Sequence, residues 1–310
     1  MFSWEKIKKP IVALAPMADY TDSPFCLMCR SFGADIVYRE MVSADAIAHG
    51  SEKTLEMARF DKRERPIILQ IFGKDPKVMA EAARILEKKY KPDGIDINMG
   101  CPARKIVSAF NGASLIREPK LAAQIIRAVK GAVKAPVSVK TRLGWEKPDE
   151  ILRFAPIIER AGADALAIHA RTKKQGFSGK ANWEMIGRAR RLLKIPVLVN
   201  GDITDTESFK KALEVSGADG ALIGRGALGK PWIFQNTKSR TVGHRESDSK
   251  KLNKIILEHA ELHFARHGEL KTFRKHLVYY VKGLPRAKRL REKLVQVETI
   301  EGLKNTLKSL

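Results

Sequence analysis

The sequence predicts an α/β protein in which a (β/α)8 TIM barrel is followed by a C-terminal all-helical domain. Three observations support this prediction: eight short apolar runs, helical spacing between them, and a change of composition after Trp232. Near-continuous apolar strands that alternate with helices are typical of parallel strands covered by helices, and eight such units in about 220 residues fit a barrel. A doubly wound open sheet is the alternative.

The eight apolar runs give the predicted strands in order. Segments with helical spacing separate them; residues 75–90, for example, have apolar side chains three and four apart behind Asp75, a suitable N-cap. We expect the strands at Ile11–Pro16, Asp35–Met41, Pro66–Phe72, Gly94–Gly100, Val137–Gly144, Ala165–Thr172, Pro196–Ile203 and Gly220–Gly226.

The residues after Trp232 have a different pattern. The polar stretch 235–249 lacks apolar periodicity and is predicted to be a linker or a lid, and the chain beyond it is predicted to be helical. From Gln235 onward, 18 Lys and Arg stand against 8 Asp and Glu. The apolar face of residues 262–284 fits a helix pair packed on the barrel, and the concentrated charge favours contact with nucleic acid. We therefore divide the chain into a catalytic barrel, 1–235, and a basic helical domain, 236–310.

Composition narrows the class of protein. A chain of 310 residues with 44% hydrophobic and 30% charged side chains is neither disordered nor fibrous, and no apolar run approaches the roughly 18 residues of a membrane span. The formal charge of +23 predicts a polyanionic partner. Three cysteines are too few for a disulfide framework, and the apolar run before Pro16 fits a strand better than a signal peptide. We expect a cytoplasmic protein with no membrane contact.

Polar side chains lie near the ends of several predicted strands. TIM barrels work at the C-terminal ends of their strands, so reactive residues are expected there. An uncompensated polar group in an apolar strand is costly, so these side chains need a ligand or a polar network. Any one of them could be a satisfied core residue, but the feature recurs in five strands. The first strand ends at Pro16, Met17 and Ala18, and the polar residues at the ends of the others are Gln70, Asn98, Lys140, Arg142, His169 and Arg171.

The last two predicted strands end in glycine-rich turns, Asn200-Gly201-Asp202 and Gly224-Arg225-Gly226. Barrels commonly bind phosphate at this place through backbone N–H groups, so FMN or a sugar phosphate is expected. Residues 224–229 also fit the G-x-G-x-x-G pattern of dinucleotide-binding folds. The pattern falls on the last strand, without a following strand that ends in an acid, which disfavours that alternative.

The three cysteines have different expected roles. Cys101 follows the fourth strand, between a glycine and a proline, so its thiol is expected near the barrel mouth. An ordinary thiol is mostly protonated at neutral pH, which suits a proton donor better than a nucleophile; a small buried filler is the alternative. Cys26 and Cys29 form a C-x-x-C pair without a second pair or nearby histidine, so we expect packing residues and no metal site.

Taken together, these motifs resemble the tRNA-dihydrouridine synthases, most closely their bacterial B-type branch. The similarity runs in order from Pro16 to Trp232 and continues in the helical part from Lys275 to Gly283. The strings that carry it are DINMGCP (Asp96–Pro102), KTRLG (Lys140–Gly144), HART (His169–Thr172), NGDI (Asn200–Ile203) and IGRG (Ile223–Gly226).

The resemblance implies an FMN-dependent enzyme that reduces the C5–C6 bond of particular tRNA uridines and uses NADPH to recharge the flavin. Hydride would pass from reduced FMN to C6, and Cys101 would protonate C5. Asn98 and Arg142 match positions near the uracil. The target base would be flipped out of the tRNA, and no stable protein partner is inferred. The residues that match flavin contacts are Pro16, Met17, Ala18, Gln70, Lys140, Asn200, Gly201, Asp202, Gly224 and Arg225, with His169 beside them.

Two departures and three alternatives remain. Many relatives have Tyr where this chain has Phe177, and residues 103–116 lack the basic pair and small residues that many relatives place near Ala109 and Asn111, so the target position is open. The first alternative is another enzyme with an FMN-binding barrel, such as a dihydroorotate dehydrogenase, which would not explain the basic C-terminal residues. An RNA-binding scaffold would not need Cys101. A phosphosugar aldolase or isomerase would use Lys140 as a Schiff-base nucleophile.

Overall fold

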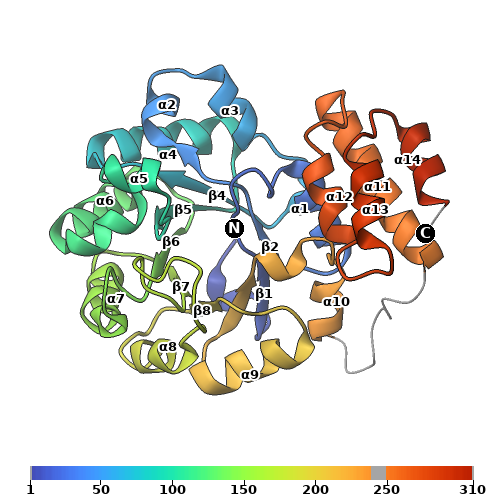
Figure 1. Cartoon of the computed structure of the whole chain (residues 1–310). Coiled ribbons are helices and arrows are strands. Elements are labelled where there is room, and N and C mark those ends of the chain that lie inside the picture. Colours follow the sequence, from blue (N-terminus) through green and yellow to red (C-terminus); the bar gives the residue numbers. More distant parts are fainter. Residues whose placement is uncertain (1, 239–248, 309–310) are drawn as a thin grey trace.

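The computed structural model describes residues 2–238 and 249–308 of the chain. Within them, nine parallel strands form one sheet, and eight of these close a barrel in the order β2-β1-β9-β8-β7-β6-β5-β4, with β4 returning to β2. The predicted TIM barrel is confirmed (Figure 1). The strands are β1 (Ile11–Leu14), β2 (Ile36–Tyr38), β3 (Val42–Ser43), β4 (Ile67–Phe72), β5 (Gly94–Met99), β6 (Val137–Arg142), β7 (Ala165–His169), β8 (Val197–Asn200) and β9 (Gly220–Ile223).

Helices surround the barrel, and the C-terminal ones gather on one side of it, next to α1 and α10 (Figure 1). Those around the barrel are α1 (Ser23–Ser31), α2 (Ala44–Ala48), α3 (Glu52–Ala58), α4 (Pro76–Tyr90), α5 (Arg104–Ser108), α6 (Pro119–Ala132), α7 (Ile151–Arg160), α8 (Trp183–Arg190), α9 (Thr206–Ser216) and α10 (Ile233–Lys238). The C-terminal group is α11 (Ser249–His267), α12 (Arg274–Tyr280), α13 (Ala287–Leu294) and α14 (Ile300–Leu307).

Local sequence signals explain where these elements begin and end. Each predicted strand forms. The short strand β3 follows the second predicted strand and, like β2, pairs with β4, but nearer the C-terminal end of β4. Asp75 caps α4 by accepting hydrogen bonds from the N–H groups of Lys77 and Val78 at 2.7 and 3.2 Å, as predicted. The helix ends at Lys91, whose left-handed backbone (φ 50°) breaks the helical repeat.

The predicted polar linker is partly helical. Gln235 to Lys238 belong to α10, and Ser249 begins α11. Residues 239–248, the middle of that stretch, lie outside the described residues. The helix extends further than composition suggests because Ile233, Phe234 and Thr237 are buried and anchor its first turns.

The barrel interior changes from apolar to polar along the strands. Its lower layers contain Ile11, Ala13, Ile68 and Leu222, and Trp4 packs with this group just before β1. The next inward positions toward the C-terminal strand ends are polar. The barrel therefore has a closed apolar base and a polar mouth.

The C-terminal helices share a second apolar core with the barrel wall. Met28 of α1 and Trp232 pack with Leu277 and other apolar residues of α11–α14. Cys26 and Cys29 are fully buried in α1, in keeping with the expected packing role, and burial raises the pKa of both thiols well above its ordinary value. No helix among the described residues is both long and apolar enough to cross a membrane.

Candidate active site

The strand register brings the predicted residues together at the mouth of the barrel. Gln70 lies opposite Asp96, Asn98 opposite Lys140, and Arg142 opposite His169. His169 in turn lies opposite Asn200. Residues in register on neighbouring strands point to the same face of a sheet, and these positions continue the inward-facing rows of the apolar base. Six of the predicted side chains therefore line one ring.

A hydrogen-bonded chain links β4, β5 and β6 inside the barrel. The Gln70 amide donates to Asp96 at 2.7 Å and accepts from Asn98 Nδ2 at 2.9 Å, and the Ser138 hydroxyl donates to Asp96 at 2.6 Å. Burial raises the pKa of Asp96 to about 6, against the hydrogen bonds from Ser138 and Gln70 that favour the carboxylate. Both ends of the Gln70 amide are engaged, and each retains one further hydrogen-bonding position for a ligand.

Asn98 and Arg142 hold the loop that carries Cys101. The Asn98 oxygen accepts hydrogen bonds from the backbone N–H groups of Gly100 at 3.1 Å and Cys101 at 3.0 Å. Arg142 Nε donates to the Gly100 carbonyl at 2.7 Å, and the Cys101 carbonyl accepts from the N–H of Ala113 at 3.1 Å. Cys101 is a half-buried free thiol. Its backbone is fixed from both sides of the loop.

Lys140 is a half-buried cation of the ring. Its ammonium donates to Asn200 Oδ1 at 3.0 Å, and Asn200 Nδ2 donates to the Leu222 carbonyl at 2.8 Å, which fixes the orientation of the amide. Burial and the neighbouring Arg142 charge lower the pKa of Lys140 to about 8. The side chain therefore remains mostly protonated at neutral pH and presents a positive charge to the mouth.

His169 is buried and neutral. Burial, together with the charges of Lys140 and Arg142, lowers the pKa of its imidazole far below the ordinary value. A Cβ atom on Gly201 would lie 2.9 Å from the His169 ring, so only glycine allows this close approach. The neutral ring can donate one hydrogen bond and accept another.

The turns after β8 and β9 approach each other closely. A Cβ atom on Gly226 would lie 2.2 Å from the Ile203 carbonyl oxygen, and one on Gly224 would lie 3.4 Å from Met17 Sδ. The Asp202 carboxylate is bound by Arg171 at 2.7 and 2.8 Å, so only its backbone remains for a phosphate. Arg225 is exposed beside these turns. The two turns therefore present glycine backbone and the Arg225 cation to a phosphate group.

The turn after β1 completes the rim. Pro16 and Met17 are half-buried and Ala18 is exposed. Thr21 fastens the turn because its hydroxyl accepts from the Met17 N–H at 3.0 Å and donates to the Met17 carbonyl at 3.1 Å. The turn is thereby fixed close to Gly224 on the neighbouring strand.

Arg171 and Phe177 have structural roles that sequence reasoning did not assign. Arg171 holds the loop after β7 to β8 through Asp202 and through the carbonyls of Ser178 and Gly179. Phe177 is 56% exposed, and the guanidinium carbons of Arg142 and Arg225 lie 5.3 and 4.7 Å from its ring centre. In the sequence, Arg171 was marked only by its position at the end of a predicted strand. Phe177 was marked only as an aromatic residue in a polar loop.

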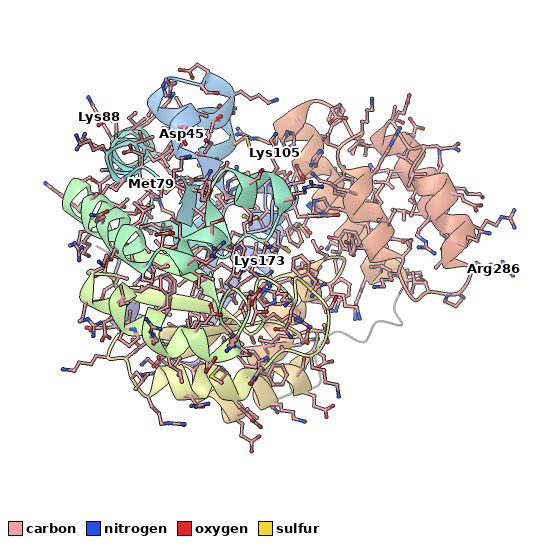
Figure 2. All side chains as sticks on the ribbon, turned by 60° about the vertical axis from the view of Figure 1, so that its left-hand side comes forward. Asp45, Met79, Lys88, Lys105, Lys173 and Arg286 are labelled. Carbon is pink, nitrogen blue, oxygen red and sulfur yellow. The ribbon has the colours of Figure 1, made fainter. Side chains whose placement is uncertain are left out.

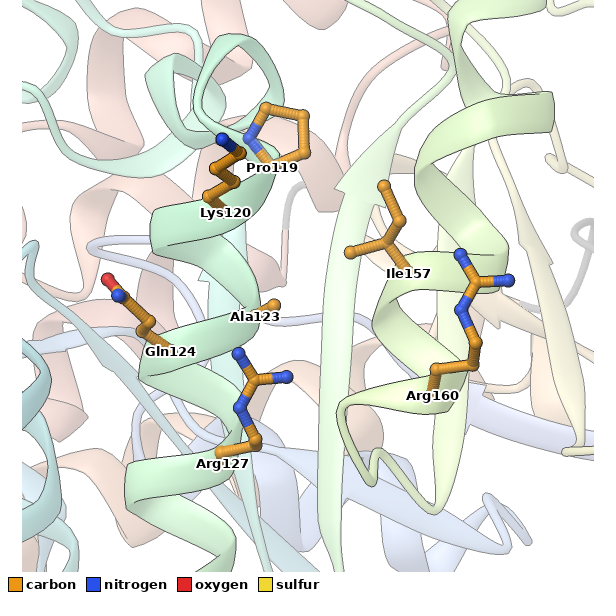
Figure 3. A pocket seen from close by; sticks show the side chains of 7 residues that line it. All are labelled: Pro119, Lys120, Ala123, Gln124, Arg127, Ile157 and Arg160. Carbon is orange, nitrogen blue, oxygen red and sulfur yellow. The ribbon is translucent and has the colours of Figure 1, made fainter.

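A groove on the outer wall lies between α6 and α7, outside the barrel (Figure 3). Its volume is about 420 Å³, and Lys120, Arg127 and Arg160 give it positive charge. It contains none of the polar residues of the mouth.

Known proteins resemble this chain over most of its length. Residues 13–310 match the family model described as dihydrouridine synthase. A probable tRNA-dihydrouridine synthase of Aquifex aeolicus is 36% identical over 302 residues, covering 96% of this chain and 94% of that protein. The tRNA-dihydrouridine synthase B of Pseudomonas aeruginosa is 39% identical over 296 residues, covering 93% and 89%.

A solved structure, the complex of 2-naphthoyl-CoA reductase with 2-naphthoyl-CoA, shares the fold. The TM-score is 0.58 at 12% identity, over 73% of this chain and 49% of that one. This likeness concerns the fold alone.

Proposed function

Because the chain belongs to the dihydrouridine synthase family, a family of flavin-dependent oxidoreductases, we propose that it reduces specific uridines of tRNA to 5,6-dihydrouridine. The observation that carries the proposal is the placement of Cys101: a free, half-buried thiol whose loop is fixed by Asn98 and Arg142 at the edge of a buried, positively charged mouth. A proton donor beside a cationic pocket is what reduction of an activated C–C double bond requires.

The mouth fits FMN. The turns at Gly201 and Gly226 leave no room for a Cβ atom, so their backbone can approach a phosphate, with Arg225 exposed beside them. Pro16, Met17, Ala18, Gln70, Lys140, His169, Asn200, Asp202 and Gly224 would surround the remainder of the cofactor. Bound there and reduced by NADPH, FMN would supply the hydride that reaches C6 of uracil.

Lys140 and His169 prepare the mouth for charge that develops during the reduction. The Lys140 ammonium is held in place by Asn200, and a preorganised cation stabilises developing negative charge without further rearrangement. His169 stays neutral, so it offers a hydrogen bond without adding to the positive charge already present.

Cys101 would deliver the proton to C5 of uracil. Its S–H bond breaks as the new C5–H bond forms, and the thiolate is left beside two cations, because Lys140 and Arg142 both interact electrostatically with Cys101. Asn98 acts as a positioning residue through the Cys101 N–H. Arg142 is 2% exposed and uses Nε and Nη1 on backbone carbonyls. Its Nη2 group has no hydrogen bond within the described part of the chain and would be the part of the side chain left for the substrate.

The C-terminal helices would bind the tRNA backbone, with residues 236–310 as the tRNA-binding domain. Exposed cations cluster on and before α13, and none forms an ion pair with a described acid. Basic side chains also border the mouth, among them Lys105 and Lys173, while Arg286 lies at the far end of the helical part (Figure 2). The cluster on and before α13 comprises Lys282, Arg286, Lys288, Arg289, Arg291 and Lys293.

Contacts between these cations and tRNA phosphates would offset the cost of flipping the uridine into the mouth. The reaction would take place in the cytoplasm, where tRNA is found.

Dihydrouridine formation on unmodified tRNA tests the proposal. Wild-type protein with FMN and NADPH should produce dihydrouridine, measured by mass spectrometry of tRNA digests. The Cys101→Ala variant should still accept electrons from NADPH and should form product at least about 100-fold more slowly, as expected for loss of a general acid. Cys101→Ser, which keeps the size of the side chain, controls for packing.

Other results would contradict the proposal. Wild-type turnover by Cys101→Ala would refute the role of the thiol, and wild type without product on any tRNA would refute the reaction. Borohydride trapping of a sugar phosphate on Lys140 would instead support an aldolase.

A further inference from the structure

Histidines gather where the C-terminal helices meet the barrel, away from the proposed catalytic ring. His259, His263 and His267 recur every fourth residue on one face of α11, His276 lies on α12, and Asp22 is the N-cap of α1. His259, His263 and His276 are at most 1% exposed. The sequence alone predicts no metal site here. Nothing in the proposed reaction uses these residues.

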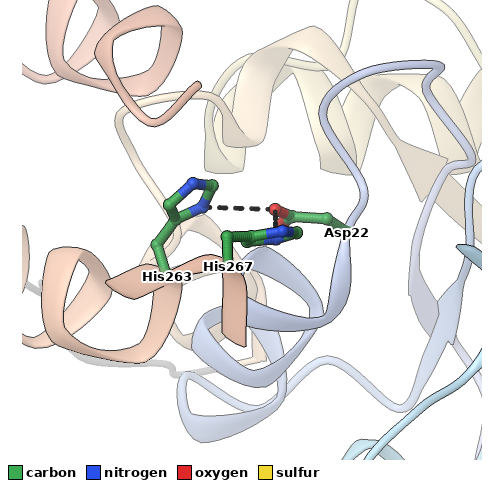
Figure 4. Close-up of side chains that lie close together, drawn as sticks. All are labelled: Asp22, His263 and His267. Carbon is green, nitrogen blue, oxygen red and sulfur yellow. Dashed lines mark hydrogen bonds and ion pairs between the residues drawn. The ribbon is translucent and has the colours of Figure 1, made fainter. Parts of the chain in front are cut away.

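Three of these side chains converge on a single point, as Figure 4 shows. Asp22 Oδ2 lies 3.4 Å from His263 Nδ1 and 3.2 Å from His267 Nε2, and one ligand atom from each residue lies within 4.8 Å of the others. A tetrahedral ion with bonds of about 2.0–2.1 Å separates its ligand atoms by about 3.3 Å. The distances from Asp22 Oδ2 to His263 Nδ1 and to His267 Nε2 therefore already match the spacing between two ligands of one metal ion.

The hydrogen bonds around His263 leave its inner nitrogen without a partner. The Thr272 hydroxyl donates to Glu269, so it accepts the Nε2–H of His263, at 3.0 Å. In the neutral ring, Nδ1 then presents a lone pair to the Asp22 oxygen, which is also an acceptor. Nδ1 is buried and has no hydrogen-bond partner. A cation between the two acceptors would give Nδ1 the partner that it lacks.

The outer contacts also suit a ligand set. A metal-binding histidine usually donates its other N–H to an oxygen that fixes the ring, and Thr272, backed by Glu269, does so for His263. Asp22 Oδ1 accepts from the Phe25 N–H at 3.1 Å, so Oδ2 is the oxygen that faces the histidines, in hydrogen-bond contact with His267 Nε2 at 3.2 Å.

We propose that Asp22, His263 and His267 bind a divalent first-row transition-metal ion, preferentially Zn²⁺. Two imidazoles and one carboxylate suit zinc, whereas Mg²⁺ and Ca²⁺ select sets made of oxygen alone. Solvent can occupy the fourth position, because the His267 side chain is 36% exposed. The ion fastens α11 to the loop after β1, which also carries Pro16 and Met17. Its role is structural and does not depend on the proposed reaction.

Metal analysis of the full-length chain without a histidine tag tests this site. After dialysis against metal-free buffer and addition of ZnCl₂, the wild type should retain about one zinc per chain, with a nitrogen and oxygen shell at about 2.0–2.1 Å in X-ray absorption. His267→Gln alters a partly exposed side chain, and Asp22→Asn preserves the helix cap. Both should bind zinc at least about 10-fold more weakly. His49→Gln, at an exposed histidine outside the cluster, should match the wild type.

Three results would overturn the assignment. A wild type that retains no zinc and whose Tm does not rise with ZnCl₂ would leave an ion pair between Asp22 and a protonated histidine instead. Undiminished zinc in both His267→Gln and Asp22→Asn would place the ion elsewhere. Zinc lost in His276→Asn but kept in His267→Gln would assign it to the second triad that shares Asp22, with His259 and His276.

Discussion

Asp96 should make the stability of the protein depend on pH, because it is a fully buried carboxylic acid in the wall of the proposed site. Its pKa is raised from 3.8 to about 6 by burial. At about 1.36 kcal/mol per tenfold change in proton affinity, this corresponds to about 3 kcal/mol. For an acid whose pKa is raised by folding, the stabilisation is complete below pH 3.8 and is lost as the pH rises through about 6.

Replacing Asp96 by Asn removes this titration and keeps the shape of the side chain. The oxygen of the introduced amide can accept from Gln70, and the Ser138 hydroxyl can turn to accept from its NH₂ group, so the hydrogen-bonded chain persists. Between pH 7.5 and pH 5, the wild type should gain about 1.4 kcal/mol of unfolding free energy relative to Asp96→Asn.

Urea unfolding followed by circular dichroism at both pH values measures this difference. The same substitution at the exposed Asp149 controls for loss of a surface carboxylate. A difference between wild type and Asp96→Asn that stays constant from pH 7.5 to pH 5 would refute the raised pKa and the buried, dry wall that causes it.

Three further predictions concern the cofactor, the loop and the tRNA. Gly226→Ala should release FMN, because its Cβ would meet a backbone oxygen at 2.2 Å, whereas Gly131→Ala, with open space around it, should retain the flavin after gel filtration. Asn98→Ala should slow dihydrouridine formation by about 100-fold, because Cys101 would be misplaced. Flavin reduction by NADPH, measured by stopped-flow absorbance, should be unchanged. An equal loss of rate in both steps would contradict the positioning role of Asn98. Binding of tRNA should weaken as salt is added: a plot of the log of the binding constant against the log of the salt concentration should have a slope of about −0.7 to −0.9 per phosphate contact. A binding constant that does not change with salt would contradict the proposed role of the basic surface.

The fold could be predicted because each barrel strand is a short buried run, so the strand pattern does not depend on distant contacts. The polar ring followed from the same pattern, since parallel strands bring their C-terminal ends together. The partner of each polar side chain could not be predicted. Asp202 was expected at the flavin, but Arg171 binds its carboxylate, and the pairing depends on how two loops meet.

Contacts between distant segments were also beyond sequence reasoning. His267 and Asp22 are 245 residues apart in the chain, and their approach requires α11 to pack on α1. Cys26 and Cys29 have no histidine near them in the sequence. In the structure, however, α11 packs on α1 and brings its histidines next to the helix that carries both cysteines. Helix α10 was missed because burial of its first turns, and not the composition of its end, decides its length.

The most direct test of the central claim is an absorbance spectrum of the purified protein, before and after addition of FMN and desalting, followed by anaerobic NADPH. We expect retained flavin that bleaches with NADPH and regains its colour when unmodified tRNA is added without oxygen. A protein that fails to retain flavin even after reconstitution would contradict the enzyme assignment and favour an RNA-binding scaffold or a phosphosugar barrel.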